Sequence, residues 1–410
     1  MRRKIEIRRG CGVMGRSHLR RFDVSEVGLG VLFEAFPTEK IRAILKATGS
    51  ESRRKRQLPA TMMVYYVIAL GLFVSAGCRE VLRRLLDGAK WIWPYEVRIS
   101  TESAITQARQ RLGSAPIAEL YREVVTPMAR KATRGAWYRA WRIVTLDGTT
   151  FDVSDSEENE QAFGRPGASR GKSSYPQIRV VGLVENGTHV LFGAQMDACT
   201  VAEVRLARKV LEALRRGMIC LADRNFFSYE LWSLAKNTGA ALLWRMRSTL
   251  VLPELRKLSD GSYLSKVYPS GRHRDRDEGG IPVRLIRYRI KGFREEYRLI
   301  TTILDPDKAP ALELAQLYSE RWTIETAFDE IKTHQRQGRI VLRSKLPELV
   351  RQDLFGLLLA HFGIRSVMHQ AALREDIETE ELSFVHTLNV IHRKLPWLVA
   401  FPPSPDFTNA

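Results

Sequence analysis

The chain has 410 residues, of which 44% are hydrophobic and 27% are charged, so it is long enough to fold around a large core as two or three domains. Its 65 Lys and Arg outnumber its 46 Asp and Glu, which gives a formal net charge of +19 at pH 7. These proportions exclude a largely disordered chain. The basic excess favours nucleic acid or an anionic lipid surface as the partner, because polyanions release counterions and steer cationic proteins.

The cysteines point to a reducing compartment. Cys11, Cys78, Cys199 and Cys220 form no CxxC pair and have no metal-ligand spacing, which argues against a cysteine zinc site. In a chain of this length they are expected to be reduced thiols of a cytosolic protein. The basic N-terminus is not followed at once by an apolar secretory core, so we expect no signal peptide and a cytoplasmic location.

Residues 1–135 are predicted to form a basic arm and a helical N-terminal DNA-binding domain. Basic clusters at 2–4, 8–9, 20–21 and 53–56 account for most of the charge of the arm. Apolar spacing predicts helices over about 31–46, 60–78, 79–86, 101–112 and 117–129. The last two flank a Gly-Ser-Ala-Pro turn at 113–116, which is consistent with a helix-turn-helix or with a helical hairpin that has no DNA role.

The segment 60–78 is uncharged for 19 residues, a length that could cross a bilayer. It contains Thr, Tyr, Ser and Gly, and it is the only such stretch in the chain. A buried central helix of the helical domain is the main interpretation, with Pro59 suited to the first helical position. A membrane-associated protein remains an alternative at this point.

From residue 141 the pattern changes to strands that alternate with helices, as expected for an α/β domain over 136–340. Strands are predicted at 142–147, 177–184, 190–196, 218–222, 241–246 and 297–304, with helices at 201–216 and 229–236. An Asn-Gly pair in the turn at 185–188 predicts a hairpin. Closely spaced turn signals predict a β-rich insertion over about 248–296, and residues 341–410 are expected to form a C-terminal helical region, with a helix near 346–373, and a Pro-rich tail.

Two of the predicted strands end in an aspartate, Asp147 and Asp223. Ligands of α/β sheets collect at the carboxyl ends of strands, where an unpaired carboxylate is costly to desolvate. Magnesium would compensate for this cost, because it takes oxygen ligands. A turn or a helix cap is the other common use of an aspartate at a strand end.

A helix predicted over about 312–332 carries a polar stripe beside its apolar one. At about 100° per residue, Tyr318, Arg321, Glu325 and Lys332 fall within roughly 60° of one another. They border an apolar stripe made of Leu317, Ile324, Phe328 and Ile331. The expected position of Glu325 is therefore where the helix packs on the sheet, although a surface helix with an Arg321–Glu325 ion pair has the same spacing. Repulsion between Glu325 and Asp329 would be relieved by a bound cation or by Lys332.

These segments together resemble the DDE transposases of bacterial insertion sequences, in particular insertion-sequence family four. The resemblance rests on Asp147-Gly148-Thr149, on residues 222–228 (ADRNFFS), and on the motif Y-x2-R-x3-E-x6-K, which Tyr318, Arg321, Glu325 and Lys332 fit without a gap. The segment 56–60 (RQLPA) resembles the helical N-terminal domain of the family, so the resemblance covers about residues 25–370. It implies a ribonuclease-H-like mixed sheet with a β insertion before the glutamate helix.

The resemblance also implies a chemistry. Asp147, Asp223 and Glu325 would be the catalytic residues and would hold two Mg²⁺ ions, for which Mn²⁺ can substitute. Tyr318, Arg321, Lys332 and Arg224 would bind DNA. Water would cut the element end, and the resulting 3′-OH would attack target DNA. The implied partner is double-stranded DNA, bound by a homodimer on paired ends in the bacterial cytoplasm.

The β insertion lacks a residue that some relatives use. Some relatives stack a flipped base on a Trp of the β insertion, but this chain has no Trp between Trp244 and Trp322. Either an aromatic residue such as Tyr263, Tyr268, Tyr288 or Phe293 substitutes, or the hairpin route does not apply.

A catalytically inactive DNA-binding remnant is the alternative to an active enzyme. Finally, residues 164–173 resemble a phosphate-binding P-loop, but Pro166 stands where that loop needs Gly, which argues against nucleotide binding.

Overall fold

The computed structural model describes residues 5–7, 34–52, 54, 57–88, 99–168, 171–172, 175–290, 295–338 and 341–394. Most of the predicted basic arm lies outside the described residues. So do Arg56 of the N-terminal motif, Phe293 and the Pro-rich tail, together with part of the segment that resembles a P-loop.

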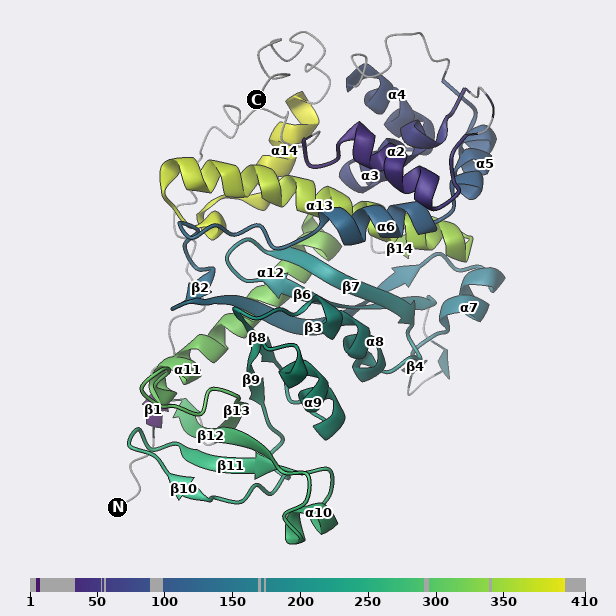
Figure 1. Ribbon diagram of the computed structural model, residues 1–410. Helices are drawn as coiled ribbons and strands as arrows, with labels where there is room; N and C mark the ends of the chain where they lie inside the picture. The colour runs from purple at the N-terminus through teal and green to yellow at the C-terminus, as the bar shows by residue number, and fades with distance from the viewer. Residues whose placement is uncertain are drawn as a thin grey trace.

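Short helices in the described N-terminal part form a group that packs on a long C-terminal helix (Figure 1). They are α2 (Thr38–Ala47), α3 (Ala60–Leu72), α4 (Cys78–Gly88), α5 (Glu102–Leu112) and α6 (Ala115–Val124). The Thr101 hydroxyl accepts a hydrogen bond from the backbone of Ala104 and so caps the N-terminus of α5. The long helix is α13 (Pro347–Glu375), and a further helix that was not predicted, α14 (Phe384–Lys394), follows it.

Helix α3 corresponds to the uncharged segment and is shorter than the 19 residues of that segment. It has 13 residues, and all of them except Thr61 are buried. A Cβ placed on Gly71 would lie 2.4 Å from the carbonyl oxygen of Gly356, so the backbones of α3 and α13 cross in direct contact. This agrees with a central helix of a helical domain. No helix in the described part of the chain is long and apolar enough to span a bilayer.

A mixed sheet forms the centre of the protein. Strand β3 (Trp141–Val153) pairs antiparallel with β6 (Gln177–Glu185), which pairs antiparallel with β7 (Val190–Ala198). On its other side β3 pairs parallel with β8 (Met218–Ala222), which pairs parallel with β9 (Ala241–Arg245). The resulting order, β7-β6-β3-β8-β9, is that of a ribonuclease-H-like sheet. The short strands β2 (Trp137–Tyr138) and β14 (Val341–Leu342) also pair with β3.

The predicted insertion continues this sheet. It contains β10 (Arg256–Lys257), β11 (Tyr263–Val267), α10 (Gly271–Asp275) and β12 (Ile281–Ile290), followed by β13 (Glu296–Thr301). Because β13 pairs with both β12 and β9, the sheet extends in the order β10-β11-β12-β13-β9. Strand β1 (Ile5–Ile7) pairs with β12, far from it in the sequence. The insertion is therefore β-rich, as expected, but it is hydrogen-bonded to the central sheet.

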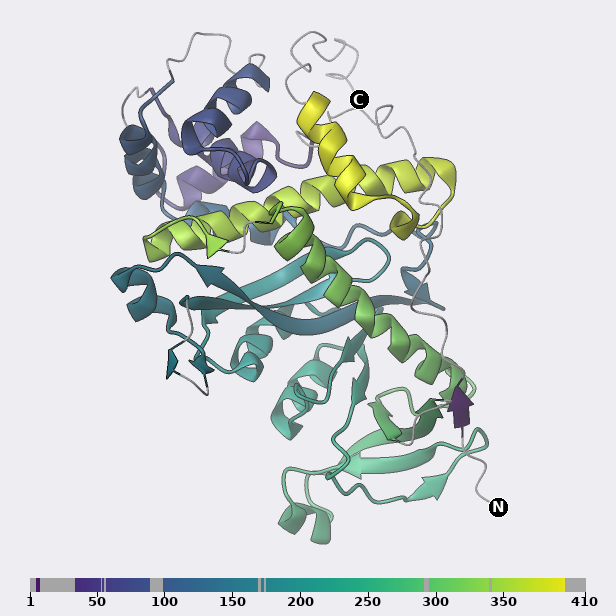
Figure 2. The same cartoon turned by 180° about the vertical axis from the view of Figure 1, so that it is seen from behind.

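Helices cover both faces of the sheet. Helices α8 (Glu203–Val210) and α9 (Tyr229–Asn237) lie on one face (Figure 1). The other face carries a continuous helical segment, residues 311–334, which we call the glutamate helix (Figure 2). It consists of α11 (Ala311–Leu317), a 3-10 turn (Tyr318–Trp322), α12 (Thr323–Asp329) and a π turn (Glu330–His334). It runs from the β10–β13 end of the molecule to α13 (Figure 2).

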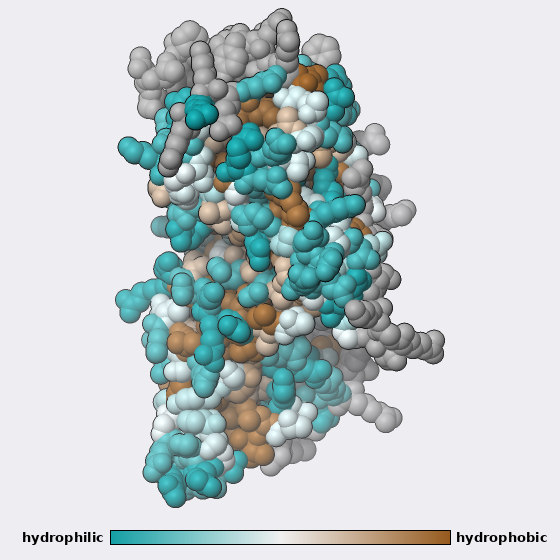
Figure 3. All heavy atoms as spheres, turned by 90° about the vertical axis from the view of Figure 1, so that its right-hand side faces the viewer, coloured by the Kyte–Doolittle hydropathy of each residue, from teal (hydrophilic) through white to brown (hydrophobic). Residues whose placement is uncertain are grey.

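The remaining short elements lie at the edge of the sheet. Helix α7 (Glu157–Phe163) and the two-stranded pair β4 (Gly167–Ala168) and β5 (Gly171–Lys172) lie between β3 and β6 in the sequence. On the side of the molecule shown in Figure 3, hydrophilic side chains dominate and hydrophobic ones form small separate groups. That side therefore presents no broad apolar surface.

Candidate active site

Asp147 and Asp223 lie side by side on neighbouring strands. The parallel register of β3 and β8 ends with Leu146 opposite Ala222, and each aspartate is the next residue on its strand. Neighbouring strands are about 4.8 Å apart. The prediction that Asp147 ends a strand is wrong, because β3 continues to Val153 by pairing with β6. Asp147 is nevertheless level with the end of β8, and so the two carboxylates share one edge of the parallel part of the sheet.

Arg321 connects Asp147 with Glu325. Its Nη1 lies 3.3 Å from Oδ2 of Asp147, and its Nη2 lies 3.8 Å from Oε1 of Glu325. The guanidinium is nearly buried, with 10% of the side chain exposed, and it stacks at 4.7 Å over the ring of Trp322. The Arg321 guanidinium thus contacts both Asp147 and Glu325, which lie far apart in the sequence.

The predicted stripes of the glutamate helix are largely confirmed. Leu317, Ile324, Phe328 and Ile331 are buried. Glu325 is more open than expected, because 54% of its side chain is exposed, and so it lies at the margin of the face that packs on the sheet. Arg321 lies 3.8 Å from Glu325 and offsets its charge, while the His334 side chain lies 3.3 Å from Asp329. Lys332 hydrogen-bonds elsewhere.

The other motif residues divide into buried and exposed ones. The Tyr318 hydroxyl donates to the carbonyl of Ala222 at 3.2 Å, which fixes the helix to the end of β8 immediately before Asp223. Lys332 reaches the hydroxyl of Thr149 at 3.1 Å, two residues beyond Asp147 on β3. Arg224 is exposed beside Asp223. Of these, Lys332 and Arg224 remain accessible to a ligand, whereas Tyr318 is buried.

Burial and neighbouring acids make Asp147 hard to ionise. Burial raises the pKa of its carboxyl to about 6, and the charges of Glu203 and Asp223 act in the same direction. The backbone amide of Gly148, which donates to Oδ1 at 2.8 Å, and the Arg321 guanidinium both act against this shift in the pKa. A carboxylate in this environment favours a nearby cation, because a cation lowers the free energy of its charged form.

Glu203 is a neighbour that the sequence did not indicate. A Cβ placed on Gly148 would lie 3.2 Å from its Oε1, so the absence of a side chain at 148 lets Glu203 approach β3. Glu203 is the first residue of α8, on a segment predicted only as a helix. Its charge is partly balanced by Arg179, whose Nη1 is 4.0 Å from Oε1.

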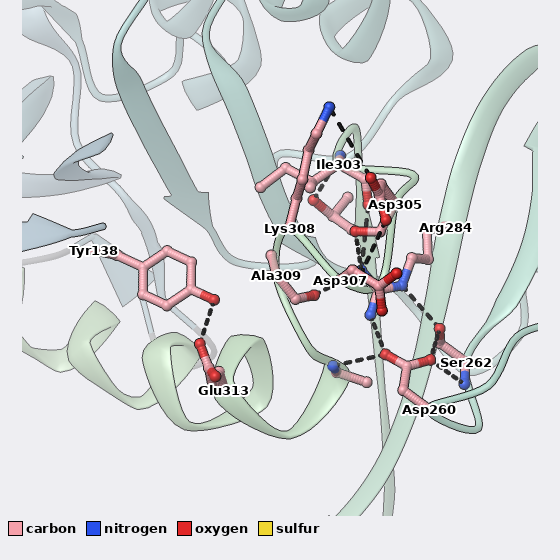
Figure 4. Close-up of polar contacts among 12 residues, drawn as sticks. Tyr138, Asp260, Ser262, Arg284, Ile303, Asp305, Asp307, Lys308, Ala309 and Glu313 are labelled. Atoms are coloured by element: carbon pink, nitrogen blue, oxygen red, sulfur yellow. Dashed lines mark hydrogen bonds and ion pairs between the residues drawn. The ribbon is translucent and has the colours of Figure 1, made fainter. Parts of the chain in front are cut away.

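The start of the glutamate helix is held by a buried ion pair between insertion residues (Figure 4). Arg284 of β12 is fully buried and pairs with Asp260, and it also donates to the Ala309 carbonyl at 2.7 Å. Asp260 accepts from the backbone of Ala311, the first residue of α11, at 2.8 Å. On the other side of α11, the Tyr138 hydroxyl donates to Glu313 at 2.8 Å. The insertion therefore sets where the glutamate helix begins.

Comparison with known proteins decides the family. The family described as "Transposase DDE domain" matches residues 141–362, and "Insertion element 4 transposase N-terminal" matches residues 26–122. The transposase InsG of insertion sequence element IS4 from Escherichia coli (strain K12) is 31% identical over 395 residues, covering 93% of this chain and 86% of InsG. This chain belongs to the IS4 family of DDE transposases.

Two further proteins resemble this transposase. The putative transposase InsZ of Escherichia coli (strain K12) is 28% identical over 216 residues, covering 52% of this chain and 69% of InsZ. Among solved structures, the piggyBac transposase synaptic complex with hairpin DNA aligns with a TM-score of 0.45 and 11% identity, over 96% of this chain and 85% of that one.

The three acidic residues of this transposase have the donor chemistry of a magnesium site. All three are carboxylates, which are the oxygen ligands that Mg²⁺ prefers. Within the described residues, no group of three His, Cys, Asp or Glu side chains is already arranged to hold a metal ion. The Arg321 cation instead lies between Asp147 and Glu325. The residues thus fit a divalent cation, provided that Arg321 moves aside.

Proposed function

We propose that this transposase cuts the DNA ends of its insertion sequence and joins them to target DNA by Mg²⁺-dependent phosphoryl transfer. The observation that supports this most strongly is the position of Arg321 between Asp147 and Glu325, with Asp223 next to Asp147 on the adjacent strand. A positive charge already occupies the space between two of the acids. The chain also belongs to a family that is defined by such an acidic triad.

We assign the catalytic and metal-binding roles to Asp147, Asp223 and Glu325. Bound Mg²⁺, which we expect as two ions with Mn²⁺ as a substitute, would polarise the attacking and leaving oxygens of an in-line displacement. The protein contributes position: the β3–β8 register fixes the two aspartates, and the glutamate helix fixes Glu325. No side chain is required as a covalent nucleophile.

Double-stranded DNA is the proposed partner, both at the element ends and at the target. Arg224, which is exposed, and Lys332, which is half-buried, lie near the acids and are proposed to contact phosphates. Arg321 is proposed to move from Asp147 towards DNA when the metal site fills. Tyr318 would act on DNA only if its hydrogen bond to Ala222 opens. The net charge of +19 predicts binding that weakens steeply with salt.

The larger organisation of the protein is also a proposal. We assign residues 1–135 to a DNA-binding domain, 136–340 to the catalytic domain and 341–410 to a C-terminal helical region. A homodimer on paired ends, acting in the bacterial cytoplasm, is the expected assembly.

A cleavage assay tests this function. The purified protein is incubated with supercoiled plasmid carrying the flanking element ends, with Mg²⁺ or with EDTA. We expect nicking with Mg²⁺ and none with EDTA. The cleavage rate should fall more than about 100-fold in Asp147→Asn, Asp223→Asn and Glu325→Gln, since loss of a metal ligand has a larger effect than loss of a residue that only supports a ligand. Glu375→Gln, which changes an exposed carboxylate at the end of α13, should cleave normally. DNA binding without nicking in the wild type would instead identify an inactive remnant.

A further inference from the structure

A second acid on the glutamate helix, Glu330, is buried in a network of charged side chains. Only 5% of Glu330 is exposed, and it lies five residues after Glu325. Its Oε2 accepts from Nε of Arg365 at 2.9 Å and lies 3.0 Å from Nε2 of His361. Its Oε1 lies 3.1 Å from Nδ1 of His189 and also contacts Arg365. Both oxygens of Glu330 therefore have partners.

The side chains of the network around Glu330 come from separate parts of the fold. His361 and Arg365 lie one turn apart on α13, and each is 1% exposed. His189 ends the turn between β6 and β7, has a left-handed backbone with φ 58°, and is also 1% exposed. Its Nε2 lies 2.9 Å from Glu380, which belongs to the 3-10 turn Thr379–Glu381 that follows α13. The network therefore joins the glutamate helix, the sheet and the C-terminal helical region.

The neighbours of Glu330 favour its ionised form. Burial alone would raise the pKa of Glu330, but Arg365, His189 and His361 outweigh it and lower the pKa well below the usual value. Burial lowers the pKa of His361, so this imidazole is neutral near pH 7. At the centre of the network the Glu330 carboxylate pairs with the Arg365 guanidinium, and His361 and His189 lie within hydrogen-bond distance of the same carboxylate. Such a buried pair contributes little to stability but fixes orientation through its geometry.

Glu325 and Glu330 face different directions on the same helix. Five residues at about 100° each separate them by roughly 140°. Glu325 therefore faces Arg321 and the sheet edge, while Glu330 faces α13. The helix takes its π form at Glu330, where Gln335 donates its backbone amide to the Glu330 carbonyl at 2.8 Å. π turns inside helices are frequent at functional sites, since they change which side chains face a given neighbour.

Gln335, which directly follows the π turn, also attaches the end of the glutamate helix to the rest of the protein. Gln335 is fully buried, and its side-chain amide donates to the carbonyls of Gly71 and Leu357, at 3.0 and 2.9 Å. These acceptors lie in α3 and α13, at the point where the two helices cross. The end of the glutamate helix is therefore attached to the helical part of the protein as well as to the sheet.

We propose that Glu330 is a positioning residue. Through the contact of both its oxygens with the Arg365 guanidinium, it sets the rotation of the glutamate helix and hence the place of Glu325 in the metal site. The inference rests on the proposed function, because it assumes that Glu325 is a metal ligand. The network is itself not proposed as a metal site, because the Arg365 guanidinium occupies both oxygens of Glu330. Together with the Asp260–Arg284 pair, it would hold the glutamate helix at both ends.

The test is direct Mn²⁺ binding, measured by electron paramagnetic resonance on the full-length protein, together with the Mg²⁺ concentration that half-saturates cleavage. Glu330→Gln should weaken Mn²⁺ binding about 10- to 100-fold, as losses around metal ligands do, and should raise the half-saturating Mg²⁺ in parallel. Binding of end DNA without metal should be unchanged. The matched control is Asp353→Asn, which opens an equally buried pair with Arg109 between α13 and α5. It should lower the melting temperature without changing Mn²⁺ affinity.

A double variant separates positioning from stability. Glu330→Gln leaves Arg365 buried without its counter-charge, so it also lowers the melting temperature. Glu330→Gln with Arg365→Met removes both charges, and it should recover most of the lost melting temperature while Mn²⁺ binding stays weak. The inference is overturned if Glu330→Gln weakens Mn²⁺ binding no more than Asp353→Asn does. It is also overturned if the double variant regains wild-type affinity along with its stability. Absence of Glu325-dependent Mn²⁺ binding in the wild type would overturn the proposed function instead.

Discussion

Arg321 Nη1 lies 3.3 Å from Asp147 Oδ2, so a side chain of the glutamate helix directly contacts an acid of the central strand. The same guanidinium lies 3.8 Å from Glu325. A divalent cation that binds these two carboxylates competes with Arg321 for the same oxygens. In the proposed mechanism, filling of the metal site would therefore release Arg321 from Asp147.

Removing the arginine should therefore have opposite effects on metal binding and on cleavage. Arg321→Met should tighten Mn²⁺ binding in the absence of DNA by up to about 10-fold, since a partly exposed ion pair contributes on the order of 1 kcal/mol. It should slow DNA cleavage, because the freed arginine is proposed to contact the substrate. Calorimetric titration with Mn²⁺ measures the first effect, with Arg343→Met as the control. Weaker Mn²⁺ binding in Arg321→Met would contradict the competition.

The pKa of Asp147 predicts how metal binding depends on pH. Burial raises this pKa from 3.8 to about 6, so protons compete with Mg²⁺ for the carboxylate below about pH 6. The half-saturating Mg²⁺ concentration should rise as the pH falls from 7 to 5 and should be nearly constant above 7. In the metal-free protein, the raised pKa of Asp147 makes the folding stability fall as the pH increases, whereas metal binding improves over the same range. A raised folded-state pKa stabilises the fold below about pH 4, and this contribution is lost as the pH rises through about 6.

Glu203 provides the control for this pH dependence. Its charge raises the pKa of Asp147, so Glu203→Gln should move the midpoint of the Mg²⁺ profile to lower pH. A profile measured between pH 4.5 and 8 in both proteins would show the shift. An unchanged midpoint would mean that Glu203 does not act on Asp147.

The crossing of α3 and α13 predicts a sensitive glycine. A Cβ at Gly356 would lie 2.4 Å from the Val67 carbonyl oxygen, so Gly356→Ala must push the two helices apart. We expect a loss of about 1–3 kcal/mol in the free energy of unfolding, typical of overpacking. Chemical denaturation measures it. Gly77→Ala, where the added Cβ meets no atom within 4 Å, should have little effect, and equal losses in both variants would argue against the close crossing.

The insertion should support the glutamate helix through Asp260. Asp260→Ala removes the acceptor for the Ala311 amide and leaves Arg284 buried without its counter-charge. Breaking a buried pair in this way costs about 3–5 kcal/mol of folding stability. Thermal unfolding should show the loss, whereas Asp307→Ala in the neighbouring loop should unfold near the wild-type temperature. A stable Asp260→Ala protein would show that this ion pair does not hold the insertion to the helix.

Local patterns predicted much of this fold. The apolar runs before Asp147 and Asp223 predicted two strands, and the helical spacing of Leu317, Ile324 and Phe328 identified the buried side of the glutamate helix. Short-range signals of this kind depend on residues near in sequence, so they can be read from the chain alone.

Long-range pairings could not be predicted in the same way. Asp147 lies inside β3 because β6 continues the ladder, and the insertion joins the sheet because β13 pairs with β9. The motif placed Arg321 near Glu325, but its contact with Asp147 depends on how the helix crosses the sheet. The network around Glu330 combines residues from several elements, and no spacing in the sequence relates them.

The most direct test of the central claim is an anomalous difference map from Mn²⁺-soaked crystals of the protein bound to element-end DNA. We expect manganese ligated by Asp147, Asp223 and Glu325, with the Arg321 guanidinium displaced from Asp147. Manganese bound elsewhere, or a filled site that leaves any of the three carboxylates without a metal contact, would contradict that claim.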